Sequence, residues 1–276
     1  MDGRWSVAPF DRAGGLPVLL LHGWPVTEHH WRYLESALRA TGMQPLSITV
    51  RGLGDGVVTG DFAKETLADE VADVVAELNL GPVAVVGHDW GGTVAYVLAA
   101  KHRQQVIALV EEEEIPPGVD APIPEEGQSH YPDWHAPLLR ADGVARRLLA
   151  GRLDDFHREF LDASGGPAGL DPTAVAAYLQ AYPAERQIDA DIALYASRPA
   201  DLATMERLRR TPLTIPVLTV GGRYAMGTAV NEAFRQLATN VTHVQSEKSG
   251  HYPLEQDPDT VLRPLVDFLT TSRPSS

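Results

Sequence analysis

Cysteine is absent from this chain of 276 residues. Disulfide bonds, thiolate metal ligands and a cysteine nucleophile are therefore excluded. No apolar stretch approaches the roughly 18 residues that a membrane-spanning helix requires. The opening segment MDGRWSVAPFDRAGG lacks the apolar core of a signal peptide. We therefore expect a cytoplasmic protein that does not bind a membrane.

Basic side chains are also in short supply. The chain has 23 Lys and Arg residues against 37 Asp and Glu residues, which gives a formal net charge of −14. Such an acidic surface disfavours nucleic acid and anionic lipid as partners. Hydrophobic residues make up 44% of the chain, which is enough for an ordinary buried core. The oligomeric state, a homodimer included, stays open.

Short apolar runs bounded by glycine or proline alternate with longer amphipathic stretches. The runs predict strands at residues 18–21, 46–50, 83–86, 106–110, 217–220 and 241–245. The amphipathic stretches predict helices at residues 28–38, 67–78, 93–101, 230–237 and 258–268. This alternation is typical of an α/β fold with a mostly parallel sheet and helices on both faces.

The alternation is interrupted once. It stops after Val110, and from about Val119 to Arg210 the chain is polar and helical, with many Ala, Asp, Arg and Pro residues. The strand pattern returns at Ile215. An insertion between two strands of the sheet is the simplest explanation. We therefore predict an α/β core formed by residues 1–117 and 211–276 and a helical lid formed by residues 118–210.

The segment Gly87-His88-Asp89-Trp90-Gly91 follows a predicted strand and precedes a predicted helix. Its Gly-x-Asp-x-Gly spacing is that of the nucleophile elbow of α/β-hydrolases, with aspartate in place of serine. The glycines are needed because this turn is strained and its backbones pack closely. The turn places Asp89 at the C-terminal edge of the sheet, where α/β proteins build their sites. The alternative is that Asp89 only caps the helix.

An aspartate nucleophile restricts the chemistry. Attack of a carboxylate on an ester carbonyl gives an anhydride, which is a poor route to hydrolysis. Attack on an sp3 carbon gives an alkyl ester that water can hydrolyse. The expected substrates are therefore epoxides or alkyl halides.

The elbow and two further motifs resemble the α/β-hydrolase fold superfamily. A His-Gly-Trp-Pro turn at residues 22–25 follows the first strong strand, and His251 lies between the last predicted strand and the last predicted helix. The chain order, with the nucleophile before the histidine, is that of this fold. The resemblance covers nearly the whole chain. It is greatest to the epoxide hydrolase branch, with haloacetate and haloalkane dehalogenases as cousins.

Hydrolysis of an ester intermediate requires an oxyanion hole. The resemblance implies that the backbone N–H groups of Trp24 and Trp90 form it. His22, Gly23 and Pro25 belong to the turn that carries Trp24. The alternative for these three residues is an ordinary strand-end turn with a buried histidine.

The resemblance makes His251 the base that activates water, and an acid must orient it. The loop at residues 221–227, where many relatives carry this acid, contains none. Four consecutive acids, Glu111, Glu112, Glu113 and Glu114, follow the strand before the lid instead.

Alignment of the subsequent Pro117-Gly118 with the family pattern selects Glu113 as this acid, although the other three remain candidates. Those that do not fill the role are expected to form a solvated charge run. We expect lid arginines such as Arg146 or Arg147 to compensate the clustered charge.

Opening an epoxide produces an alkoxide, so an acid must donate a hydrogen bond or a proton to the ring oxygen. Epoxide hydrolases supply this donor from the lid. Here Trp134-His135 and Ala193-Leu194-Tyr195 resemble the lid segments of a subgroup that uses a histidine–tyrosine pair. The resemblance therefore selects His135 and Tyr195. The alternatives are a capping or surface histidine for His135, and for Tyr195 a tyrosine that packs the lid onto the core.

Three further tyrosines stand in reserve as donors: Tyr131, Tyr178 and Tyr182.

Two differences from the dehalogenases favour the epoxide reaction. Related haloacetate dehalogenases have arginine at the positions of Trp90 and Thr93, where it clamps the substrate carboxylate. Haloalkane dehalogenases carry asparagine at the position of Trp24. The predicted function is therefore a cofactor-independent epoxide hydrolase with a small-molecule epoxide as its partner. The alternatives are a haloacid or haloalkane dehalogenase, and a binding module that has lost catalysis.

No other segment predicts a cofactor or metal site. His29 and His30 are adjacent on a predicted helix, so they cannot face one metal ion and are expected at the surface. Asp171 and Asp201 lie at predicted helix starts, where capping explains them.

Overall fold

The computed structural model describes residues 6–7, 15–141, 143–182 and 184–273. One sheet has the strand order β1-β3-β2-β4-β5-β6-β7. All neighbouring strands are parallel except β1 and β3. The bounds are β1 Ser6–Val7, β2 Pro17–Leu21, β3 Gln44–Thr49, β4 Val83–His88, β5 Val106–Glu112, β6 Val217–Gly222 and β7 Val241–Ser246. The predicted α/β fold with a mostly parallel sheet is confirmed.

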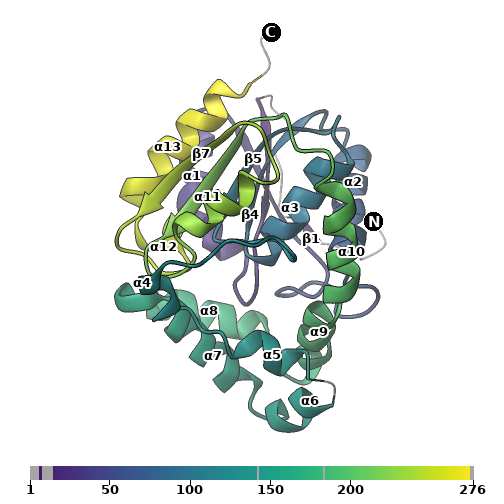
Figure 1. Ribbon diagram of the computed structural model, residues 1–276, viewed down its shortest axis with the longest axis vertical. Helices are drawn as coiled ribbons and strands as arrows, with labels where there is room; N and C mark the ends of the chain where they lie inside the picture. Colours follow the sequence, from purple (N-terminus) through teal and green to yellow (C-terminus); the bar gives the residue numbers. More distant parts are fainter. Residues whose placement is uncertain (1–5, 8–14, 142, 183, 274–276) are drawn as a thin grey trace.

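Helices cover both faces of this sheet (Figure 1). Their bounds are η1 Glu28–Trp31, α1 Arg32–Ala40, α2 Lys64–Glu77, α3 Trp90–Lys101, α11 Thr228–Phe234, α12 Pro253–Gln256 and α13 Pro258–Thr271. Alternate residues of β2 enter different apolar clusters. Leu19 and Leu21 pack with residues of α2, α3 and α11, whereas Val18 and Leu20 pack with residues of α1 and α13. The period of two therefore buries each strand on both sides, as parallel sheets require.

The chain between β5 and β6 is helical. It contains α4 Glu125–Gln128, α5 His135–Leu139, α6 Val144–Leu149, α7 Leu153–Ser164, η2 Gly166–Ala168, α8 Pro172–Ala181, α9 Ala184–Ala196 and α10 Arg198–Leu208. We call this segment the helical insertion. Figure 1 shows α5 to α8 gathered below the sheet, with α9 and α10 returning toward α2 and α3.

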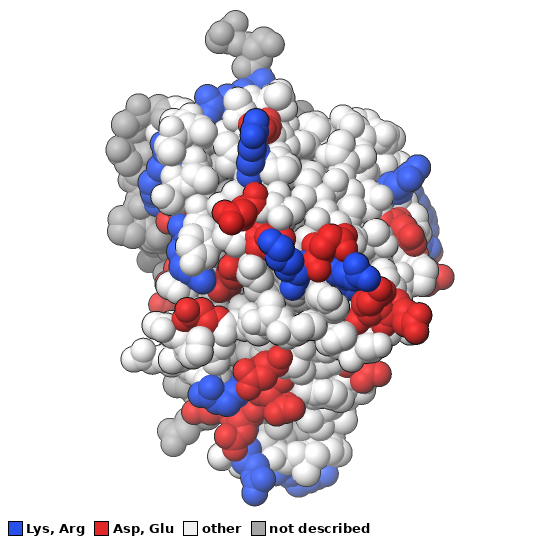
Figure 2. All heavy atoms as spheres, turned by 90° about the vertical axis from the view of Figure 1, so that its left-hand side faces the viewer, with Lys and Arg blue, Asp and Glu red and all other residues white. Residues whose placement is uncertain are grey.

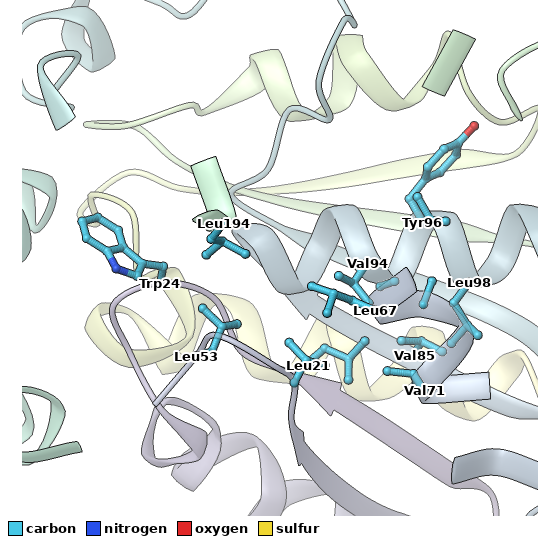
Figure 3. Packing of buried hydrophobic residues seen from close by; sticks show 14 of the residues in the cluster. Leu21, Trp24, Leu53, Leu67, Val71, Val85, Val94, Tyr96, Leu98 and Leu194 are labelled. Atoms are coloured by element: carbon cyan, nitrogen blue, oxygen red, sulfur yellow. The ribbon is translucent and has the colours of Figure 1, made fainter. Parts of the chain in front are cut away.

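Apolar packing continues from the sheet into the helical insertion. Figure 3 shows Leu21, Val85 and Val94 within the core, with Trp24 and Leu194 toward one end of the same cluster. Leu194 belongs to α9, so the insertion and the core share one hydrophobic cluster. Burial of apolar area therefore holds the two together.

The surface carries the excess of acidic side chains. On the face shown in Figure 2, basic side chains are scattered among acidic ones, and acidic groups gather in the lower half, at the level of α7 and α8 in Figure 1. None of the helices in the described ranges combines the length and apolarity needed to cross a membrane.

Close packing of β2 against α3 depends on Gly91. A Cβ atom added there would lie 2.1 Å from the Leu21 carbonyl oxygen and 2.5 Å from that of His22. We therefore expect Gly91→Ala to lower the free energy of unfolding by about 1–3 kcal/mol, because the added methyl group overpacks the contact. Urea unfolding measures this loss.

Gly42→Asn is the matched control. Gly42 has φ +71°, and an added Cβ would meet nothing within 4 Å. Asparagine tolerates this left-handed conformation, so we expect a loss below about 1 kcal/mol. Equal losses in both variants would contradict the close-packing explanation.

Candidate active site

Asp89 occupies the turn between β4 and α3. Its backbone has φ 50° and ψ −130°, a conformation that L-residues rarely adopt. Although Asp89 is the N-cap residue of α3, its side chain makes no capping hydrogen bond. The capping interpretation of this residue is therefore wrong. The strained turn leaves the carboxylate free to contact other groups.

The turn at residues 22–25 packs directly against Asp89. A Cβ atom on Gly23 would lie 2.3 Å from the Asp89 Cβ, so only glycine fits there. The Trp24 backbone N–H donates to Asp89 Oδ1 at 2.9 Å. Trp90 is the first residue of α3, where backbone N–H groups have no partner within the helix. His22 is buried beneath this turn, beside the Gly23 carbonyl oxygen.

His251 lies between two carboxylates. Its Nε2 atom is 3.5 Å from Asp89 Oδ2, and its Nδ1 atom is 3.2 Å from Glu113 Oε2. Glu113 also accepts backbone N–H groups from Gly222, Met226 and Gly227 at 2.6, 2.9 and 3.1 Å. Since a carboxylate is an acceptor, Glu113 fixes the proton on Nδ1 and the orientation of the ring. The arrangement brings together the three residues that the sequence predicts as nucleophile, base and orienting acid.

The two carboxylates also set the charge of the histidine. Burial alone lowers the pKa of His251, but its contacts with the Asp89 and Glu113 carboxylates outweigh burial and raise the pKa to about 9. The ring is therefore an imidazolium at neutral pH. Loss of the Asp89 charge would remove much of this support.

The other three glutamates are buried, at 0%, 0% and 6% exposure for Glu111, Glu112 and Glu114. The expectation of a solvated charge run is wrong. Burial and the charge of Asp89 raise the pKa of Glu114 to about 8, and Thr93 Oγ1 donates to it. Burial raises the pKa of Glu111 well above its usual range, and neither of its oxygens has a hydrogen-bond partner among the described residues. Glu111 and Glu114 are therefore uncharged acids at pH 7.

The expected compensation by a lid arginine is also wrong for Arg146, which pairs with the exposed Asp189. Protonation compensates Glu111 and Glu114 instead. The Glu112 carboxyl group is instead compensated by His30, whose Nε2 atom lies 2.7 Å from Glu112 Oε2.

Aromatic rings of the helical insertion lie over the nucleophile. The ring of His135 stacks on that of Trp24, with centroids 5.9 Å apart. The Tyr195 ring meets the rings of Trp24 and Trp90 edge-on at 5.6 and 5.2 Å. Burial, followed by the charge of Asp89, raises the pKa of Tyr195 well above its usual range, so the phenol keeps its proton. His135 and Tyr195 thus lie beside the groups that surround Asp89.

The reserve tyrosines differ in their surroundings. Tyr178 and Tyr182 use their hydroxyl groups elsewhere, on Glu255 and on the Val26 carbonyl oxygen. The ring of Tyr131 lies 4.9 Å from that of His251. Tyr131 is therefore the one reserve tyrosine of the three that adjoins the triad.

His135 has a defined tautomer. Its Nδ1 atom is 2.9 Å from the Pro132 carbonyl oxygen, which can only accept a hydrogen bond. Burial lowers the pKa of His135 to about 4. The ring is therefore neutral at pH 7, with the proton on Nδ1 and a lone pair on Nε2.

His30, Glu112 and Glu255 form a buried ion network near the triad, which the sequence does not predict. His30 is 0% exposed, so the expectation of a surface position is wrong, whereas His29 is exposed. His30 Nδ1 and Nε2 lie 2.9 and 2.7 Å from Glu255 Oε1 and Glu112 Oε2. Burial lowers the pKa of His30, but the charges and hydrogen bonds of Glu112 and Glu255 outweigh it and raise the pKa to about 9.

His30, His88 and Glu112 also offer ligand atoms that lie within 4.8 Å of one another. Both nitrogens of His30 already contact carboxylates, so an imidazolium supplies the positive charge there. His88 is close to the triad as well, with Nε2 2.9 Å from the His251 carbonyl oxygen. No sequence signal identifies these contacts, because the partners are far apart along the chain.

Comparison with known proteins finds relatives for most of the chain. A model of the alpha/beta hydrolase family matches residues 18–263. The soluble epoxide hydrolase of Corynebacterium sp. (strain C12) is 30% identical over 274 residues, which cover 94% of this chain and 92% of that protein. The structure of the epoxide hydrolase CorEH without ligand is similar with a TM-score of 0.83 and 28% identity, covering 98% of this chain and 95% of that one. Wild-type Cfl2 from Burkholderia cenocepacia gives a TM-score of 0.84 and 25% identity, with coverage of 93% and 89%.

The His30 network predicts a loss of stability at alkaline pH. Because the pKa of His30 is raised to about 9 in the folded protein, its contribution is complete below pH of about 6.5 and is lost as the pH rises through about 9. The contribution is on the order of 3 kcal/mol. Urea unfolding of the wild type and of His30→Gln should give a difference that shrinks between pH 6 and pH 10.

The exposed neighbour provides the control. His29→Gln should leave the free energy of unfolding unchanged at each pH, since His29 is exposed. A difference between wild type and His30→Gln that stays constant with pH would show that the imidazolium does not carry the effect.

Proposed function

Because the chain belongs to the alpha/beta hydrolase family and to its epoxide hydrolase branch, we propose that it converts an epoxide to a vicinal diol through an ester on Asp89. The observation that carries this proposal is the position of Asp89 between the His251–Glu113 pair and the Trp24 backbone amide. An aspartate at this position suits attack on an sp3 carbon, as in an epoxide.

Ring opening is the first step. The Trp24 amide holds Asp89 Oδ1, so Oδ2 attacks an epoxide carbon and the bond from that carbon to the ring oxygen breaks. The Tyr195 hydroxyl donates a hydrogen bond to this oxygen. The oxygen gains one proton overall, which His251 loses. The products are a hydroxyalkyl ester on Asp89 and a neutral imidazole.

This proton balance follows from the electrostatics of the triad. The Asp89 carboxylate supports the raised pKa of His251. Ester formation removes the negative charge, so the pKa of His251 falls and the ring releases its proton. The histidine thus becomes a base at the stage that requires one.

Hydrolysis is the second step. Neutral His251, oriented by Glu113, takes a proton from water, and the resulting hydroxide oxygen bonds to the ester carbonyl carbon. The Trp24 and Trp90 amides stabilise the oxyanion. Collapse breaks the bond from the carbonyl carbon to the alkoxide oxygen, and the alkoxide takes the proton from the imidazolium and leaves as the diol. The Asp89 carboxylic acid formed in this step gives its proton back to His251, which restores the carboxylate and the imidazolium. In the closed cycle one water is consumed for each epoxide.

We assign the lid role to residues 118–210, which contribute His135 and Tyr195. His135 and Tyr195 have unequal parts in this scheme. The phenol is a donor at neutral pH, whereas His135 Nε2 donates only when its ring is protonated or changes tautomer. Tyr195 is therefore the principal donor to the epoxide oxygen. His135 packs beside it and supplies a second hydrogen bond in its protonated state.

Halide displacement from a haloalkane is the second candidate function. The indole N–H groups of Trp24 and Trp90 are buried and have no hydrogen-bond partner among the described residues. Two such donors suit a leaving halide. A haloacid is less favoured, because Thr93 at the position of a carboxylate clamp donates to Glu114 instead.

The ester intermediate can be trapped. In His251→Gln, ester formation should proceed, with solvent in place of His251 as the source of the proton that the ring oxygen gains, while ester hydrolysis stops because the base is absent. Intact-protein mass spectrometry after mixing with a panel of small epoxides should show an increase equal to the whole epoxide mass. The double variant Asp89→Asn/His251→Gln is the control and should show none.

Other outcomes are decisive. An adduct formed from a haloalkane with loss of hydrogen halide, and none from epoxides, would establish the second candidate. No adduct with either panel would point to a binding module. In the wild type, a single turnover in ¹⁸O water should place the label in Asp89 and not in the first diol.

The two lid donors can be separated by matched substitutions. Tyr195→Phe and His135→Phe both keep an aromatic ring and remove the polar atoms. At pH 7 we expect Tyr195→Phe to slow ester formation by about 100-fold or more, and His135→Phe to slow it less than about tenfold. Rapid-quench measurement of the ester tests this order. A larger loss in His135→Phe would make the histidine the principal donor.

A further inference from the structure

A buried lysine lies where the core meets the helical insertion. Lys64 is the first residue of α2, and its side chain is 1% exposed. Its ammonium donates to the Leu194 carbonyl oxygen at 2.6 Å and to Ser197 Oγ at 2.8 Å, and it lies 3.1 Å from Asp201 Oδ2. An ammonium has three N–H donors, so each of them has an acceptor on the insertion.

Asp201 completes this junction. It accepts the backbone N–H of Lys64 on Oδ1 at 2.8 Å, and thus caps α2 as well as neutralising the ammonium. The expectation that Asp201 caps its own helix is wrong, because the N-cap residue of α10 is Ser197. Lys64 and Asp201 therefore connect α2 to α10.

Two contacts of the ammonium converge on Tyr195. Lys64 Nζ lies 3.8 Å from the centroid of the Trp90 ring, and Trp90 meets the Tyr195 ring at 5.2 Å. A cation over an aromatic face is attracted to it. The second contact is the Leu194 carbonyl, which belongs to the residue directly before Tyr195.

The Leu194 carbonyl lies at a position in its helix where a cation stabilises the backbone. Leu194 lies in the last turn of α9, where carbonyl oxygens lack partners within the helix. A positive charge is favourable at this end. The ammonium, together with the Ser197 hydroxyl that also donates to this carbonyl oxygen at 2.8 Å, therefore fixes the backbone beside Tyr195, while Trp90 restrains its ring.

We propose that Lys64 is a positioning residue that holds the Tyr195 hydroxyl where it meets the epoxide oxygen. This role rests on the function proposed above. Burial lowers the pKa of Lys64, and the attraction of Asp201 opposes this effect. Apolar side chains of similar volume often replace a buried ion pair without loss of stability, so a purely structural contact does not require the charge.

The test compares the two chemical steps. Lys64→Met keeps the unbranched side chain and removes the charge. Rapid-quench and mass measurements should show that ester formation slows by about 10- to 100-fold, because misplacement of a reacting group costs about this much. Ester hydrolysis should stay within about twofold, because it uses His251, Glu113 and the backbone amides of Trp24 and Trp90 and does not use the Tyr195 hydroxyl. Lys101→Met is the control, since Lys101 pairs with Glu65 and Asp69 at the surface.

Two double variants test the link between Lys64 and Tyr195 and allow for a folding defect in Lys64→Met. Lys64→Met added to Tyr195→Phe should slow ester formation no further, because the hydroxyl that Lys64 positions is already absent. If Lys64→Met alone fails to fold, Lys64→Met/Asp201→Leu removes both charges and takes its place. The proposal would be overturned if Lys64→Met slowed ester formation and ester hydrolysis equally. It would also be overturned if Lys64→Met slowed ester formation further in the Tyr195→Phe background.

NMR spectroscopy tests whether Lys64 positions Tyr195 without requiring catalysis. With ¹³Cζ-labelled tyrosine, the Tyr195 resonance is assigned by its loss in Tyr195→Phe. It should shift in Lys64→Met and stay in place in Lys101→Met. An unshifted resonance would overturn the proposal even if the enzyme is active. A wild type that forms no ester contradicts the proposed function, whereas the resonance still tests whether Lys64 positions Tyr195.

Discussion

A carboxyl group buried away from water must either find a donor or keep its proton, and this constraint organises the C-terminal edge of the sheet. The chain places four such groups in succession at the end of β5. Glu113 is satisfied by three backbone amides and His251. Glu112 is satisfied by His30. Glu111 and Glu114 have raised pKa values and stay protonated at neutral pH. Four chemically identical residues are thus accommodated in three different ways: by backbone amides with a histidine, by a second histidine, and by a raised pKa.

The same constraint connects charge to chemistry at the nucleophile. Asp89 and Glu113 together hold His251 as an imidazolium. In the proposed reaction, formation of the ester discharges one of these two carboxylates and therefore frees the histidine to act as a base. The protonated Glu114 adds no second negative charge beside Asp89 at neutral pH. The site can thus carry one reactive carboxylate in a region that holds several acids.

Polar contacts fix the helical insertion over this site. Lys64 reaches α9 and α10 from the core, and Tyr178 of α8 donates to Glu255 of α12. Tyr182 donates to the Val26 carbonyl oxygen near the turn that carries Trp24. These contacts come in addition to the shared apolar cluster. Because hydrogen bonds have a preferred direction, they can set the orientation of the insertion where apolar burial alone cannot.

The sequence alone determined the sheet, its flanking helices and the family, because period-two apolar runs and the elbow spacing are local patterns. It also predicted Asp89, His251 and Glu113, and in the structure His251 lies 3.5 Å from Asp89 and 3.2 Å from Glu113. Only the tertiary structure decided the raised pKa values of Glu111 and Glu114, the burial of His30 and the contacts of Lys64. A pKa depends on neighbours in space, and these neighbours lie as far apart along the chain as His30 and Glu255 or Lys64 and Asp201.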